Sequence, residues 1–218
     1  LYWLPETLVI VLYPNMQDFG EQRIVDEFFP PGVLGFTEYG NNRIALPYSG
    51  NDHEFKATLS HEIAHACQNL FVKDESDVAD KLGLPNNSRP RYPLWFSEGF
   101  AEFSSSDIYM DSLGEQSDYR RYRTEEINLE LTVNEKIPSL EELKYNGGFL
   151  VYTMGYEFLR FMAKRFAPDS ISNLMKKTAR NEDFEKAWLH TFKEPLLTSE
   201  TEWWKKRKEN KEKKCYAN

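Results

Sequence analysis

The first part of the chain alternates short apolar runs with polar breaks, a pattern typical of strands interleaved with helices. An uninterrupted apolar run at residues 7–14 is rich in β-branched side chains, ends at Pro14, and predicts a buried strand. Apolar residues then recur at helical spacing over residues 16–29 and predict a helix. Two shorter apolar segments predict the strands of a hairpin, at residues 33–38 and 43–47.

The next helix is predicted from a capping pattern and an apolar stripe. Asn51 can cap the free N–H groups of the first turn, and Glu54, three residues on, can reach back to it. The apolar residues that follow at helical spacing predict one core-facing side, made of Phe55, Leu59, Ile63, Ala66 and Leu70. His61 and His65 lie off that side. Residues four apart on a helix are stacked neighbours, so both imidazoles can reach one ion.

The second half of the chain reads as almost entirely helical. A helical pattern at residues 94–110 is followed by others at residues 116–131, 148–166, 169–179 and 183–192, and by a last helix capped by Ser199-x-x-Glu202. We therefore expect an α+β fold with two lobes. Residues 1–115 would form a small mixed sheet with the histidine helix, and residues 116–218 a helical lobe.

Composition narrows the classes of function. A chain of 218 residues with 40% hydrophobic and 15% aromatic residues can bury a substantial core. The net charge of −8 argues against nucleic-acid binding, which needs Lys and Arg in excess on one face. Every apolar run is shorter than the roughly 18 residues that cross a bilayer, so we expect no membrane span in the chain. With two cysteines, neither a disulfide framework nor a four-cysteine zinc site can form.

The segment His61-Glu62-x-x-His65 carries the residues of a zinc hydrolase. A catalytic zinc ion takes three protein ligands and leaves a position for water, whose pKa falls to about 7. The two histidines supply two ligands, and Glu62 can take a proton from that water and later deliver one to a leaving amine. The pattern arises by chance in roughly one of a hundred shuffled sequences. The alternative is a pair of surface histidines on an amphipathic helix, so the third ligand decides.

The metzincin arrangement of the third ligand is excluded by the sequence. It needs a glycine three residues and a histidine six residues beyond His65, where Gln68 and Phe71 stand. The remaining arrangement takes a carboxylate from a second helix. The segment WFSEGFAEF, residues 95–103, offers one.

HEIAH followed by WFSEGFAEF resembles the gluzincin zinc peptidases, which include thermolysin-like peptidases and zinc aminopeptidases, and most closely the small bacterial peptidase-MA-like domains. In that family the glutamate of the Trp-x-x-Glu-Gly motif is the third zinc ligand, which the resemblance assigns to Glu98. The segment at 151–166 is similar to the family's Tyr-x-x-Gly helix, whose tyrosine faces the scissile carbonyl. The resemblance gives that role to Tyr152. Tyr156 stands four residues later, on the same face of the helix, and is the substitute candidate. It covers nearly the whole chain.

The resemblance implies a zincin-like fold, one Zn²⁺ ion and hydrolysis of peptides or proteins. The Gly-x-Met-Glu-Asn stretch with which the aminopeptidases hold a free N-terminus is missing, so we expect cleavage within a chain rather than from its N-terminus. The separation between His65 and Glu98 is longer than in the aminopeptidases. Residues 73–92, which are polar and contain Gly83 and two prolines, are therefore expected to be an inserted excursion that borders the cleft.

Two further residues are candidates for orienting the ligands. Glu102, one turn after Glu98, can accept a hydrogen bond from the far nitrogen of His61, or it can be an exposed helical glutamate. Ser97 can do the same for His65.

A second hypothesis from another functional class is a zinc-bearing binding or scaffold domain without turnover, one module of a larger protein. The presence of Glu62 and Tyr152 argues against it. The size of related proteins favours the cell envelope or the outside of the cell as the compartment. The natural substrate and the oligomeric state are not readable from the sequence.

Overall fold

The computed structural model describes residues 7–21, 33–38, 42–48, 50–81, 92–113, 127, 137–145, 148–167, 169–179 and 183–215. These residues form three strands and seven helices, so the α+β prediction is confirmed at that level. The chain divides into two compact units: Leu1–Asn86 with Phe100–Arg121, and Asn87–Gly99 with Tyr122–Asn218. The predicted lobes at 1–115 and 116–218 stay a prediction.

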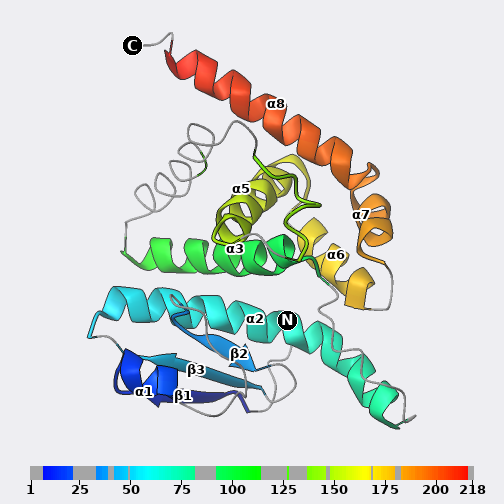
Figure 1. Cartoon of the computed structure of the whole chain (residues 1–218). Helices are drawn as coiled ribbons and strands as arrows, with labels where there is room; N and C mark the ends of the chain where they lie inside the picture. The colour runs from blue at the N-terminus through cyan, green and yellow to red at the C-terminus, as the bar shows by residue number, and fades with distance from the viewer. Residues whose placement is uncertain are drawn as a thin grey trace. The chain divides into compact units, whose positions relative to one another are not determined.

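A three-stranded sheet forms the base of the first unit (Figure 1). Its order is β1 (Val9–Tyr13), β3 (Arg43–Pro47) and β2 (Phe36–Glu38). β1 runs parallel to β3, and β2 runs antiparallel to β3, which confirms the predicted hairpin. The short helix α1 (Met16–Glu21) follows β1 and contributes the buried Phe19.

The long helix α2 (Asp52–Lys81) lies along the sheet and contacts β2 and β3 (Figure 1). Asn51 caps its first turn as predicted, because the Asn51 Oδ1 accepts a hydrogen bond from the Glu54 N–H at 3.3 Å. Ala66 packs into a core cluster with Ile44 and Leu46 of β3, and the apolar neighbours include Phe55, Leu59 and Ile63. The predicted core-facing side of α2 is thus confirmed for its four described members; the side chain of Leu70 lies outside the described residues.

Two predictions about the first unit are wrong. The strand at 7–14 was expected to be buried, but Val9, Ile10 and Leu12 are 46%, 46% and 54% exposed. An apolar run predicts a strand, whereas burial also needs covering layers, and among the described helices α1 is the one that contacts β1. Residues 73–81 were expected to belong to an excursion, but they continue α2. No glycine or proline interrupts the sequence from residue 52 until Gly83, so the helix has no reason to stop earlier.

Helices make up most of the described part of the second unit. They are α5 (Leu150–Arg165), α6 (Asp169–Ala179), α7 (Phe184–Phe192) and α8 (Leu196–Cys215). The start of α3 (Leu94–Leu113), up to Gly99, belongs to this unit as well. The predicted helix at 116–131 lies almost wholly outside the described residues. Among the described helices, none has the length and apolar character needed to span a bilayer.

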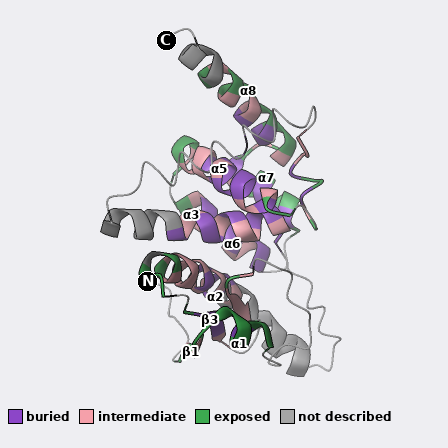
Figure 2. Ribbon diagram, turned by 60° about the vertical axis from the view of Figure 1, so that its left-hand side comes forward, coloured by how far each residue is buried: buried purple, intermediate pink, exposed green. Residues whose placement is uncertain are grey.

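Aromatic rings fill the core of the second unit. Trp95 is 1% exposed, and its ring meets those of Phe158 at 5.6 Å and Trp188 at 6.2 Å between centroids. Buried residues accordingly run along α5 and into α7 (Figure 2). The tryptophan of the WFSEGFAEF segment therefore anchors the start of α3 in a rigid core.

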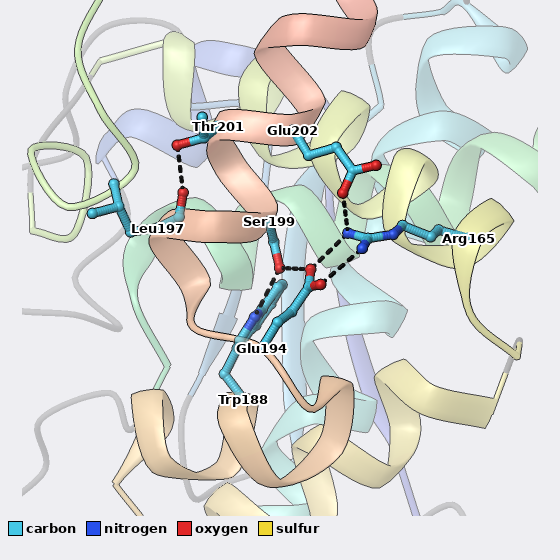
Figure 3. A network of polar contacts seen from close by, with 7 residues as sticks. All are labelled: Arg165, Trp188, Glu194, Leu197, Ser199, Thr201 and Glu202. Carbon is cyan, nitrogen blue, oxygen red and sulfur yellow. Dashed lines mark hydrogen bonds and ion pairs between the residues drawn. The ribbon is translucent and has the colours of Figure 1, made fainter.

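The last helix begins earlier than the sequence predicts. Ser199 was expected to cap it, but α8 starts at Leu196, directly after Pro195, a residue that suits the first turn of a helix. Ser199 is instead fully buried and accepts a hydrogen bond from the Trp188 indole at 3.3 Å (Figure 3). Its hydroxyl donates to Glu194, which also holds the Arg165 guanidinium at 2.6 and 2.8 Å. This network ties α5, α7 and α8 together.

Candidate metal centre

The two histidines of α2 turn the same ring nitrogen toward each other. Their ring centroids are 4.7 Å apart with the planes at 75°, as the spacing of four residues on a helix allows. The Nε2 atoms of His61 and His65 lie 3.0 Å apart. Both side chains are partly buried, so the two nitrogens are only partly hydrated.

The far nitrogens of both rings lie against oxygen acceptors. His61 Nδ1 lies 3.2 Å from the Glu102 carboxylate, which stands on α3 and belongs to the same unit. His65 Nδ1 lies 2.8 Å from Oε1 of Gln68, a side chain that is 3% exposed. The contact of Glu102 with His61 is the one that the sequence suggested. The contact of Gln68 was missed, and the part suggested for Ser97 stays a prediction.

These contacts favour one tautomer of each histidine. A carboxylate oxygen and an amide oxygen accept hydrogen bonds, which favours the tautomer of each ring with its hydrogen on Nδ1. In a neutral ring Nε2 then has a lone pair in place of a hydrogen. The two Nε2 atoms face each other across 3.0 Å, where two lone pairs can share one cation, either a proton or a metal ion. The arrangement therefore fits a metal ion, whose histidine ligands typically donate the other ring N–H to such acceptors.

Glu98 is the third ligand that the resemblance predicts. It stands on α3 one turn before Glu102, on the same side of that helix. Glu98 belongs to the second unit, whereas both histidines belong to the first, and its role as the third ligand stays a prediction.

Glu62 lies beside the histidines and is 6% exposed. Its Oε2 accepts a hydrogen bond from the Thr37 hydroxyl of β2 at 2.7 Å. The Thr37 oxygen is also 2.8 Å from the backbone carbonyl of Glu62. The sequence analysis did not find Thr37, because it comes from another element and forms no motif with the HEIAH segment.

The two tyrosine candidates lie on α5 in the second unit. Tyr152 is partly exposed in the first turn, where its ring lies 6.4 Å from that of Phe149. Tyr156, one turn on, is 1% exposed. The part of Tyr152 as oxyanion donor stays a prediction.

Comparison with known proteins provides no relative. No protein-family model, curated protein or solved structure matches the chain. The resemblance to gluzincins therefore rests on the three sequence motifs.

Proposed function

We propose that the chain is a zinc-dependent peptidase of the gluzincin type with a zincin-like fold. The observation that carries the proposal is the geometry of the histidine pair. Two Nε2 atoms face each other at 3.0 Å while both Nδ1 atoms lie against oxygen acceptors. Such a pair is suited to a shared cation and has no comparable role as two surface histidines.

The donor set favours zinc over other common ions. The proposed ligands are two imidazole nitrogens, from His61 and His65, and one carboxylate oxygen, from Glu98, a set found in many catalytic zinc sites. Calcium and magnesium prefer sets made of oxygen alone. Three protein ligands leave a fourth position for water. When bound, the ion supplies a Lewis acid that makes this water acidic enough to attack a carbonyl at neutral pH.

Glu62 is the proposed general base. It takes a proton from the attacking water and then gives a proton to the leaving amine, so the peptide bond breaks without releasing an unstable amide anion. Its burial suits this part, because a base that is shielded from bulk water keeps the proton for the leaving group. Tyr152 is the proposed donor to the oxyanion that forms on the carbonyl oxygen.

The proposed substrates are peptides or proteins, cut within the chain rather than at a free N-terminus. The alternative is a zinc-bearing scaffold domain that performs no hydrolysis. It predicts zinc binding without turnover, so the two are separated by an activity measurement alone.

Digestion of casein by the metal-free protein, before and after addition of one equivalent of zinc, tests the proposal. We expect hydrolysis after zinc addition, its loss with a chelator, and its return with further zinc. Mass spectrometry of the products distinguishes internal cleavage from removal of N-terminal residues. A zinc-loaded protein that cleaves neither casein nor a peptide library would contradict the proposal and favour the scaffold.

A further inference from the structure

Among the described residues, the hydroxyl of Thr37 forms its hydrogen bonds with Glu62 of α2. Its oxygen is 2.7 Å from Glu62 Oε2 and 2.8 Å from the Glu62 carbonyl oxygen. Both residues belong to the first unit, in which β2 and α2 are in contact. One hydroxyl carries one hydrogen, and the carboxylate is the stronger of these two acceptors because it is charged.

The backbone of β2 is built to bring Thr37 to this position. Pairing with β3, with Thr37 opposite Ile44, fixes the register of the strand. Gly35 lies two residues earlier, so a side chain there would point to the same side as that of Thr37. A Cβ atom at Gly35 would lie 3.0 Å from the Thr58 methyl group and 3.3 Å from Glu62 Cγ. The missing side chain therefore lets this end of the strand approach α2 closely.

We propose that Thr37 is a positioning residue for the general base. Its hydroxyl holds Oε2 of Glu62, so the carboxylate cannot rotate freely and Oε1 remains the oxygen that receives the proton from water. The inference rests on the proposed function and deepens it. A base that is held in one orientation reacts faster, because the orientation is not lost and regained at each turnover.

Three variants separate positioning from packing. Thr37→Val keeps the shape of the side chain and removes the hydroxyl, whereas Thr37→Ser keeps the hydroxyl. Thr178→Val is the matched control. Thr178 is 1% exposed, and its hydroxyl donates to the backbone carbonyl of Leu174 at 3.1 Å. Gly35→Ala tests the same link from the backbone, since it pushes the strand away from Glu62 without touching the hydroxyl.

We expect Thr37→Val to lower kcat roughly 10–100-fold, the usual effect of removing a group that orients an active-site residue. KM and zinc content should stay near those of the parent. Thr37→Ser should regain most of the loss, Gly35→Ala should also lower kcat, and Thr178→Val should keep the parent kcat. An unchanged kcat in Thr37→Val, or a loss that Thr37→Ser does not restore, would overturn the inference.

A second measurement does not depend on turnover. Acetohydroxamate binds zinc and offers an N–OH proton to a neighbouring carboxylate, so its affinity for the zinc-loaded protein reports on how Glu62 is held. We expect several-fold weaker binding to Thr37→Val and parent-like binding to Thr37→Ser and Thr178→Val. If the zinc-loaded parent cleaves no peptide, the proposed function fails. The Thr37 inference is then tested by these affinities alone. Equal affinities of the parent and Thr37→Val would then overturn it.

Discussion

Gly99 of α3 and Gly155 of α5 touch backbone to backbone in the second unit. A Cβ atom on Gly155 would lie 2.7 Å from the Cα of Gly99, and a Cβ atom on Gly99 would overlap the backbone of Gly155. Gly99 directly follows Glu98, and Gly155 completes the Tyr-x-x-Gly pattern that starts at Tyr152. The two glycines of the motifs thus share one helix crossing, which alanine cannot enter without displacing the backbone.

Gly155→Ala should lower the free energy of unfolding. In an open helix this change stabilises by roughly 1 kcal/mol, because alanine is the better helix former. At the crossing the overpacking caused by the added methyl group is expected to outweigh this gain, with a net loss of about 1–3 kcal/mol. Urea denaturation followed by circular dichroism measures the difference.

The control for this prediction is Gly20→Ala in α1, where an added Cβ atom meets nothing within 4 Å. That variant should be as stable as the parent or slightly more so. Equal stability of Gly155→Ala and the parent would show that the two helices separate easily at this point.

Glu62→Gln should retain zinc and lose nearly all hydrolysis. The amide has the shape of the carboxylate and can still accept a bond from Thr37, but it cannot take a proton from water. Hydrolysis of a fluorogenic peptide and zinc content, measured on the same sample, check both parts. Activity within about tenfold of the parent would show that Glu62 is not the general base.

Tyr152→Phe should lower kcat about 10²–10³-fold and leave KM and zinc content nearly unchanged. A hydrogen bond to the oxyanion strengthens as negative charge forms on it, so its loss affects the transition state more than substrate binding. Tyr156→Phe is the matched control: Tyr156 is a 1% exposed core residue, and we expect its change to affect stability rather than kcat. If instead Tyr152→Phe keeps the parent kcat, the oxyanion is stabilised by Tyr156 or by the ion alone.

Glu200 makes the stability of the second unit depend on pH. Burial raises the pKa of this carboxyl above 4.5, although the Leu140 N–H donates to its Oε1 at 2.9 Å. A raised folded-state pKa means that the folded protein binds the proton more tightly than the unfolded one. The free energy of unfolding should therefore rise as the pH falls from neutral through the raised pKa, and level off near 4.5.

Glu200→Gln keeps an acceptor for Leu140 and removes the charge. It should be more stable than the parent at pH 7, with a difference that shrinks toward pH 4.5. Thermal melts of both proteins across this range provide the test. A difference that is independent of pH would show that the buried charge is not its cause. A change of about 1 kcal/mol moves Tm by roughly 2–4 °C in proteins of this size.

Local sequence patterns predicted the helices and strands better than they predicted how those elements are buried. The stripe on α2 and the cap at Asn51 were found because both depend on residues within one helix. The exposure of β1 was missed because it depends on which elements cover the strand. The start of α8 was misplaced because Ser199 resembles a cap in sequence, while its hydroxyl bonds to Trp188 and Glu194 in the core.

The same distinction holds at the candidate site. His61 and His65 were found from their spacing alone, and Gln68 could have been found too, since it stands three residues after His65 on the same helix. Thr37 gave no such signal. It comes from a strand 25 residues before Glu62, and only the pairing of that strand and its packing on α2 bring the two together.

The most direct test of the account is the zinc content of the purified protein, measured by elemental analysis after dialysis, in the parent and in Glu98→Ala. The account predicts one zinc per parent molecule and a strong loss in the variant, because two histidines alone hold the ion weakly. Full zinc occupancy in Glu98→Ala would place the third ligand elsewhere. A folded parent that binds no zinc would contradict the central claim.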